Sequence, residues 1–111
     1  MPLFPLGKFT VTPGTPIRLT SGQTNPNEKF GTHGVMVQAL FNNTGKIYVG
    51  NSTLNKGAMT GVHATLAIPT ANTIPSFTAA LTAAPNSVNL ADLWIDGDVQ
   101  GEGVTVSYLQ A

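Results

Sequence analysis

The chain has 111 residues, of which only 9% are charged, and its formal net charge at pH 7 is zero. Ordinary soluble domains contain about 25% charged residues, so hydroxyl and amide side chains must supply much of this surface. Zero net charge excludes a general attraction to nucleic acid or anionic lipid, and the absence of cysteine excludes disulfides and thiolate chemistry. A surface with few charges costs little to desolvate, as at the centres of protein contacts. We therefore expect an assembly component rather than an enzyme, although a small β domain with a hydroxyl-rich surface would have the same composition.

The N-terminal residues 1–7 are apolar and contain two prolines. Proline fixes φ, lacks an N–H and restricts the residue before it, so this segment is predicted to be an extended arm. Such an arm must bury its apolar side chains, either against the edge of its own sheet or against a neighbouring molecule. Its candidate partner contacts are Leu3, Phe4 and Leu6.

The rest of the chain is rich in strand signals separated by Gly, Pro and Asn, and its length predicts a single domain over residues 1–111. Residues 76–84 fit either a helical stripe or one face of a strand, and we favour the strand. Residues 21–33 are predicted to form a polar loop. The other predicted strands cover residues 8–12, 17–20, 34–41, 46–50, 57–69, 93–95 and 104–109.

Two of these strands are predicted to form a β-hairpin. Residues 42–45 (NNTG) separate the strands 34–41 and 46–50, and Asn and Gly tolerate the positive φ angles of tight turns. Several short strands with turn residues between them are typical of a sandwich or barrel. The predicted fold class is therefore all-β, a single β-sandwich of jelly-roll type.

An acidic cluster follows the strand at 93–95. Asp96, Asp98, Gln100 and Gly101 match the first half of a calcium loop, but Ser107 stands where that loop needs a bidentate Glu. We therefore predict no metal site. Asp96 and Asp98 are instead interpreted as exposed carboxylates of a hairpin turn and as candidate polar contacts.

No catalytic residues are predicted. The two histidines, His33 and His63, have no metal-ligand spacing with another His or Cys, and no glycine pattern matches a phosphate-binding loop. We predict no cofactor. Trp94 and Tyr48 lie among branched aliphatic residues, which favours a place in the core or on a sheet face over a platform for sugar stacking. No apolar run is long enough for a membrane span, and we expect neither a nucleic-acid nor a membrane partner.

The charged residues are segregated along the chain. All five cations precede residue 57, and four of the five anions follow residue 91. If the fold separates these two regions, the molecule has a mildly positive end and a negative hairpin tip.

Four segments together resemble small structural proteins of tailed bacteriophages. The nearest likeness, which extends to the total length, is to the head decoration ("cement" or "staple") proteins of short-tailed phages. It covers roughly residues 34–109, and residues 1–30 match nothing in that family. The segments are GKIYVGNS at 45–52, the Gly/Ala/Thr-rich middle, NLADLWIDG at 89–97 and GEGVTVSYL at 101–109.

The resemblance implies a compact β-sandwich that decorates the outside of a capsid. Such a protein is made in the cytoplasm of the bacterial host, bridges neighbouring major capsid subunits and has no enzymatic activity. Association with further copies of itself stays open. Two alternatives stay open. One is a carbohydrate-binding virion adhesin, which would expose Trp94 and Tyr48 beside the acidic turns. The other is a structural component of the tail or neck.

Overall fold

The computed structural model describes residues 3–19, 31–32, 34–80, 88–89 and 92–109, and every element in these ranges is a β-strand. None of the described residues forms a helix long and apolar enough to cross a membrane. The strands are β1 (Leu3–Thr10), β2 (Ile17–Arg18), β3 (Gly31–Thr32), β4 (Gly34–Ala39), β5 (Ile47–Asn55), β6 (Thr60–Leu66), β7 (Ser76–Ala80), β8 (Val88–Asn89), β9 (Trp94–Gly97) and β10 (Gly103–Leu109).

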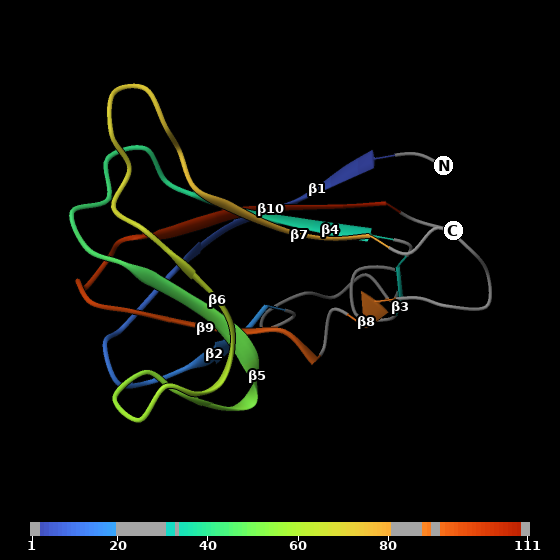
Figure 1. Ribbon diagram of the computed structural model, residues 1–111. Helices are drawn as coiled ribbons and strands as arrows, with labels where there is room; N and C mark the ends of the chain where they lie inside the picture. Colours follow the sequence, from blue (N-terminus) through green and yellow to red (C-terminus); the bar gives the residue numbers. More distant parts are fainter. Residues whose placement is uncertain (1–2, 20–30, 33, 81–87, 90–91, 110–111) are drawn as a thin grey trace.

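Eight of these strands form two four-stranded antiparallel sheets that face each other (Figure 1). The β1 sheet has the order β1-β10-β4-β7, and the β2 sheet has the order β2-β9-β5-β6. Among the described strands, only β5 and β6 are both consecutive in the chain and paired with each other, and β3 pairs with β8 separately. The all-β sandwich predicted from the sequence is therefore confirmed.

The core lies between the two sheets and follows from the alternation of side chains along each strand. In β4, Val35, Val37 and Ala39 are buried, whereas Met36 between them is exposed. Burial of each large apolar side chain contributes about 1.5–3 kcal/mol. The other buried apolar members of this cluster are Leu6, Phe9, Val11, Leu19, Ile47, Val49, Leu66, Leu93, Ile95, Val104, Val106 and Tyr108.

The hairpin predicted from residues 34–41 and 46–50 is wrong. β4 belongs to the β1 sheet and β5 to the β2 sheet, so the connection between them crosses the sandwich instead of reversing within one sheet. The local NNTG signal was read as a tight turn, but Asn43 is buried and hydrogen-bonds to Gly103, far away in the sequence. Tertiary contact therefore overrides the local turn preference here.

The region around Asp96 and Asp98 is likewise not a hairpin turn. β9 lies in the β2 sheet and β10 in the β1 sheet, so residues 98–102 pass from one sheet to the other. The strand predicted over residues 76–84 is confirmed as far as Ala80, and residues 81–84 lie outside the described part. Of the loop predicted over 21–33, the described residues 31–32 form β3.

The extended N-terminal arm is not confirmed as a separate element. From Leu3 onward the backbone belongs to β1, which pairs with β10 and has an irregularity between Pro5 and Gly7. Leu6 is only 8% exposed and belongs to the core of its own chain. The side chains of Leu3 and Phe4 lie outside the described part of the structure.

Candidate functional site

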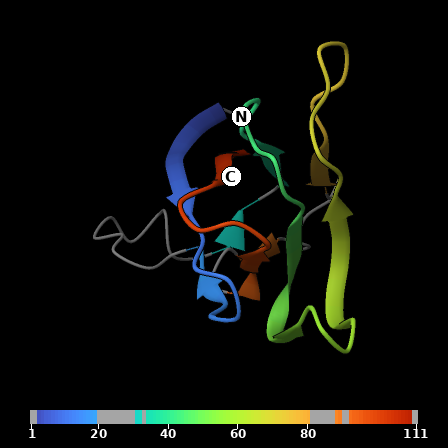
Figure 2. The ribbon, with the colours of Figure 1, turned by 90° about the vertical axis from the view of Figure 1, so that its left-hand side faces the viewer.

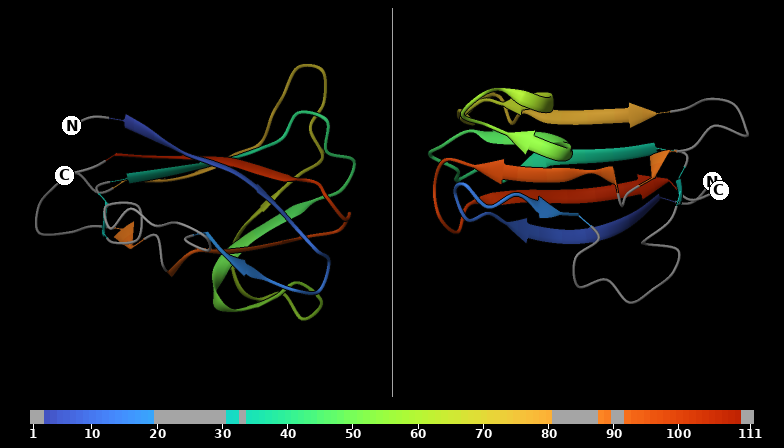
Figure 3. Two further views of the ribbon diagram at one scale, coloured as in Figure 1. Left: turned by 180° about the vertical axis from the view of Figure 1, so that it is seen from behind. Right: turned by 90° about the horizontal axis from the view of Figure 1, so that it is seen from below.

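One end of the sandwich gathers four connections between the sheets, and we call it the loop end. It comprises residues 11–16 between β1 and β2, 40–46 between β4 and β5, 67–75 between β6 and β7, and 98–102 between β9 and β10. These segments lie at the left in Figure 1, face the viewer in Figure 2, and lie at one end of the strands in both views of Figure 3.

The loop end exposes large apolar side chains. Phe41 is 77% exposed, Ile68 is 47%, Ile74 is 43% and Val99 is 37%. We call these four the apolar loop residues. They come from three of the four connections, so the fold places them at one end although they are up to 58 residues apart (99 minus 41). The remaining exposed large apolar residues in the described part are Met36, on β4, and Met59, in the β5–β6 turn.

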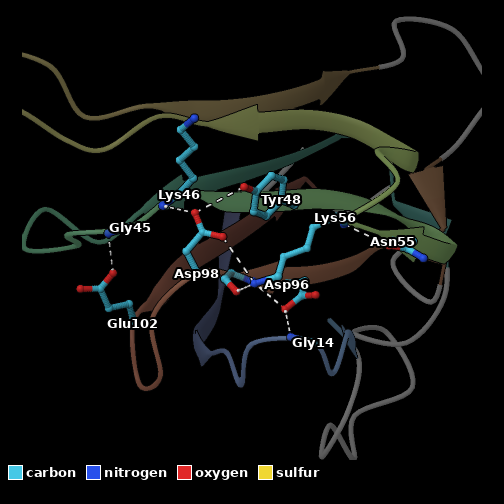
Figure 4. A network of polar contacts seen from close by, with 11 residues as sticks. Gly14, Gly45, Lys46, Tyr48, Asn55, Lys56, Asp96, Asp98 and Glu102 are labelled. Carbon is cyan, nitrogen blue, oxygen red and sulfur yellow. Dashed lines mark hydrogen bonds and ion pairs between the residues drawn. The ribbon is translucent and has the colours of Figure 1, made fainter.

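Glu102 joins two of the connections. Its Oε2 accepts hydrogen bonds from the backbone N–H of Thr44 (2.7 Å) and from the Thr44 hydroxyl (2.8 Å). Its Oε1 accepts one from the Gly45 N–H (2.9 Å), as Figure 4 shows. Desolvation raises the pKa of Glu102, but these hydrogen bonds outweigh it, and the pKa lies below the ordinary value of 4.5. A carboxylate therefore fixes the backbone beside Phe41.

Asn43 supports the same junction from inside. It is buried, its Nδ2 donates to the Gly103 carbonyl (2.9 Å), and its Oδ1 accepts from the Gly103 N–H (3.3 Å). The side-chain amide thus pairs with one residue at the start of β10, as a neighbouring strand would. Because buried polar groups must be satisfied, this pairing fixes the distance between the two connections.

Asp98 ties the loop end to β5. It accepts hydrogen bonds from the Lys46 N–H (3.4 Å) and the Tyr48 hydroxyl (3.3 Å), and it forms an ion pair with Lys56 (3.4 Å). Burial raises the pKa of Tyr48 above 10.0, and the charge and hydrogen bond of Asp98 raise it further, with a smaller contribution from Asp96. Asp98 itself is exposed, as the sequence predicted.

Asp96 does not lie on an exposed turn, and this part of the prediction is wrong. It is the third residue of β9 and only 2% exposed. Its Oδ1 accepts from the Gly97 N–H (2.7 Å) and the Gly14 N–H (3.2 Å), which fastens the β1–β2 connection (Figure 4). A buried carboxylate needs such donors because it has lost its water. Asp96 is thus unsuited to direct contact with a partner.

The charge segregation along the sequence does not give two oppositely charged ends. β9, which carries Asp96, is paired with β2, which carries Arg18, and with β5, and the Lys56 ammonium lies 3.4 Å from the Asp98 carboxylate. Antiparallel pairing brings the late anions back beside the early cations. The expected positive end and negative tip are therefore not formed by these residues.

A shallow hollow of about 270 Å³ opens beside Asp96 and the β5–β6 turn. It is lined by both apolar and polar groups, and the Lys56 ammonium beside it donates to the Gly97 carbonyl and pairs with Asp98. Among the described residues no group of three or more His, Asp or Glu could hold a metal ion. The lining residues are Gly14, Pro16, Leu54, Asn55, Lys56, Gly57 and Asp96.

Two aromatic residues lie on the outer face of the β2 sheet. Tyr48 is half-buried and directly opposite Asp96, and Trp94 is half-buried with the Arg18 guanidinium 5.0 Å from its ring centre. Trp94 Nε1 is buried and has no hydrogen-bond partner among the described residues. His63, on β6, stacks on Phe77 of β7 with ring centres 6.3 Å apart, whereas His33 lies outside the described residues.

Sequence reasoning missed the apolar loop residues. The sequence predicts Phe41 as the last residue of the strand 34–41, yet β4 ends at Ala39 and Phe41 is exposed. The residue next to an Asn-Asn-Thr-Gly run could have been recognised as part of a connection, since such runs lie at the surface. Comparison of the chain with protein-family models, with curated proteins and with solved structures found no match.

Proposed function

We propose that this chain is a capsid decoration protein that binds the outer surface of a phage head and bridges neighbouring major capsid subunits. The observation that carries the proposal is the exposure of four large apolar side chains on three connections at one end of a charge-poor sandwich. Monomeric proteins seldom expose large contiguous apolar patches, and such patches mark sites of association. In this proposal the chain is made in the cytoplasm of the bacterial host.

The topology supports the proposal. The described strands form two four-stranded sheets joined by crossing connections and by one hairpin, an arrangement that suits a jelly roll. Eight-stranded jelly rolls occur in viral capsid domains and also in lectins. The fold is therefore compatible with the virion and with the carbohydrate-binding alternative. Trp94 argues against that alternative because its ring is half-buried beneath Arg18 and does not form an open platform.

The hydrogen bonds of the loop end support binding to a fixed surface. Glu102, Asn43 and Asp96 join three of the four connections before any partner arrives. A preorganised surface loses less conformational entropy on binding, so more of the apolar contact energy is retained as affinity. The exposed Asp98 is suited to the polar rim of the contact, where charges orient partners more than they hold them.

The energies are adequate for a protein present in many copies. Removal of a large apolar side chain from water contributes about 1.5–3 kcal/mol, so several such residues give a modest contact per copy. A chain that bridges two subunits gains further from bivalent attachment, provided that both sites are engaged at once. Leu3 and Phe4 stay predicted contacts, but they begin β1, the far end of which leads into the loop end, so they would form a second contact away from this surface.

The proposal is tested with heads of the source phage that lack this chain. Purified chain is added, the particles are sedimented, and the bound fraction is measured for the wild type and for Phe41→Ala. We expect Phe41→Ala to weaken binding about 10-fold or more, from loss of roughly 1.5–3 kcal/mol of apolar contact. Met59→Ala is the matched control, because Met59 is 54% exposed but lies in the β5–β6 turn.

Equal binding of Phe41→Ala and the wild type would refute the loop end as the contact surface. Failure of the wild-type chain to bind heads would refute the function itself. Retention by purified host polysaccharide instead of heads would identify the adhesin alternative.

A further inference from the structure

The sandwich has four edge strands, and they differ in how far they are protected against pairing with another chain. β1 and β7 are the edges of the β1 sheet, and β2 and β6 are the edges of the β2 sheet. An edge strand presents unpaired N–H and C=O groups, and proteins blunt such edges with proline, bulges, charged residues or short length.

Three of these edges carry such protection. β1 contains Pro5, an irregular pairing beside Gly7 and the exposed Lys8. β2 has only two residues, one of which is Arg18. β6 loses its register with β5 at two places, so His63 is left between the pairs formed by Val62 and Ala64.

β7 has none of these devices. Ser76–Ala80 contains no proline and no charged residue, and it pairs with β4 in unbroken register over all five residues. Within the described part of the chain its hydrogen-bonded neighbour is β4 alone. No described strand pairs with the other side of β7, although the His63 ring of β6 stacks on Phe77.

The direction of the unpaired groups follows from the ladder. Ala39 donates to the Pro75 carbonyl (3.0 Å), so this facing pair is a hydrogen-bonded pair. Hydrogen-bonded pairs alternate in an antiparallel ladder, which makes Val37 with Phe77 the next one. The N–H and C=O groups of Ser76, Thr78 and Ala80 therefore point away from β4.

We propose that β7 accepts an extended, uncharged segment of a major capsid subunit as an added strand. This inference rests on the proposed function. β7 begins at Ser76, directly after the 67–75 connection that carries Ile68 and Ile74, so the edge is continuous with the contact surface proposed above. A partner that covers the loop end can extend along β7 without leaving the molecule.

The chemistry of the segment follows from its neighbours. Strands β4 and β7 contain no charged residue, and the half-buried Phe77 faces the core side of the edge. A charged side chain placed there would lose water without gaining a partner. An added strand should therefore carry small or apolar side chains beside Phe77 and hydroxyl or amide side chains beside the exposed Thr78.

A second copy of the chain fits the edge less well. Pairing of β7 with β7 of another copy would be antiparallel about a two-fold axis, and this axis reverses the strand direction. The loop ends of the two copies would then point in opposite directions. Only one of them could face the capsid, whereas a strand supplied by the capsid subunit leaves every loop end directed toward the particle.

The test compares Thr78→Pro with Thr78→Ala on heads that lack the chain. Proline removes a donor only on the outward side of β7, where proline is tolerated, so the β4 pairing survives. Alanine removes the same side chain but keeps the N–H. We expect Thr78→Ala to bind like the wild type and Thr78→Pro to bind roughly 10-fold more weakly, since a strand contact loses a hydrogen bond.

Hydrogen exchange of the wild-type chain supplies a direct readout. The amides of Thr78 and Ala80 should exchange more slowly on the particle than in the free chain, while outward amides of β1 should not change. If the wild type binds heads and both Thr78 variants bind equally, with no protection of these amides, the strand proposal is wrong and the decoration function stands. If the wild type does not bind heads, the function is wrong as well.

A third result would identify a different occupant. If Thr78 and Ala80 become protected in the free chain as its concentration rises, and sedimentation shows a dimer that Thr78→Pro abolishes, the edge binds a second copy. That outcome would overturn the assignment to a capsid segment.

Discussion

The loop end has two parts that are held in different ways. The β4–β5 and β9–β10 connections are joined by side chains from distant parts of the sequence, chiefly Asn43 and Glu102. In the β6–β7 connection at 67–75, the hydrogen bonds among described residues run mainly between Thr70 and Thr73, and at its end the Ala39 N–H donates to the Pro75 carbonyl. Apolar residues of both parts are exposed. At the loop end, the connections around Phe41 are thus held by long-range hydrogen bonds, whereas the 67–75 connection is held mainly by local ones.

Removal of the buried Asn43 side chain is the strongest test of this difference between long-range and local hydrogen bonds. Asn43→Ala deletes two hydrogen bonds to Gly103 and takes the Asn43 acceptor from the buried Gly103 N–H, while the Gly103 carbonyl still accepts from the Leu40 N–H. We expect a loss of about 1–3 kcal/mol in the free energy of unfolding, measured with urea. Asn42→Ala is the control, because Asn42 is exposed and adjacent, and it should change stability by less than ~0.5 kcal/mol. Similar losses in both variants would show that the hydrogen bonds of Asn43 do not stabilise the junction between the two connections.

The stabilisation that the hydrogen bonds of Glu102 supply should depend on pH. The pKa of Glu102 is lower in the folded chain than its ordinary value of 4.5, so its hydrogen bonds stabilise the fold fully above pH 4.5. This contribution is lost as the pH falls through the lowered folded pKa. Urea unfolding of the wild type and Glu102→Gln between pH 7 and pH 3 should therefore converge at the acidic end. A constant difference across that range would contradict the role given to the carboxylate.

Asp98 should have a smaller effect, because it is exposed and its ion pair with Lys56 is worth at most ~1 kcal/mol. Its clearer signature is the titration of Tyr48. Burial is the largest cause of the raised pKa of Tyr48, and Asp98 adds to it by charge and by hydrogen bonding. In Asp98→Asn the pKa should fall toward 10.0 and stay above it. An unchanged tyrosinate absorbance titration would exclude this contact in solution.

The smallest effect is expected in the other part of the loop end. Thr70→Ala removes the hydroxyl that accepts from the Thr73 and Asn72 N–H groups, both exposed. The free energy of unfolding should change by less than about 0.5 kcal/mol. A loss of stability as large as that of Asn43→Ala would show that hydrogen bonds stabilise the 67–75 connection as strongly as the connections joined by Asn43.

The sequence predicted the sandwich because its alternation records which side chains face the core, as for Val35, Val37 and Ala39. It could not predict which strands pair, because pairing depends on contacts between residues far apart. The NNTG run predicted a hairpin from local conformational preference, whereas the Asn43 side chain hydrogen-bonds to Gly103, 60 residues further along the chain. Asp96 was misplaced for the same reason, since its donor Gly14 lies 82 residues away.

The candidate contact surface was predicted least well. Leu6 was selected for being apolar in a proline-containing segment, but β1 places it in the core. Phe41 was assigned to a strand that ends two residues earlier. Apolar character predicts burial on average, and only the tertiary structure distinguishes an apolar side chain in the core from one kept exposed for a partner.

The central claim is that the loop end binds a seam between capsid subunits. The most direct measurement compares the affinity of the chain for assembled heads lacking it with its affinity for unassembled major capsid subunits, at equal subunit concentration. A site that spans a seam exists only in the lattice, so we predict binding to heads at least about 100-fold tighter, as expected for bivalent engagement. Equal affinity for heads and free subunits would contradict the account.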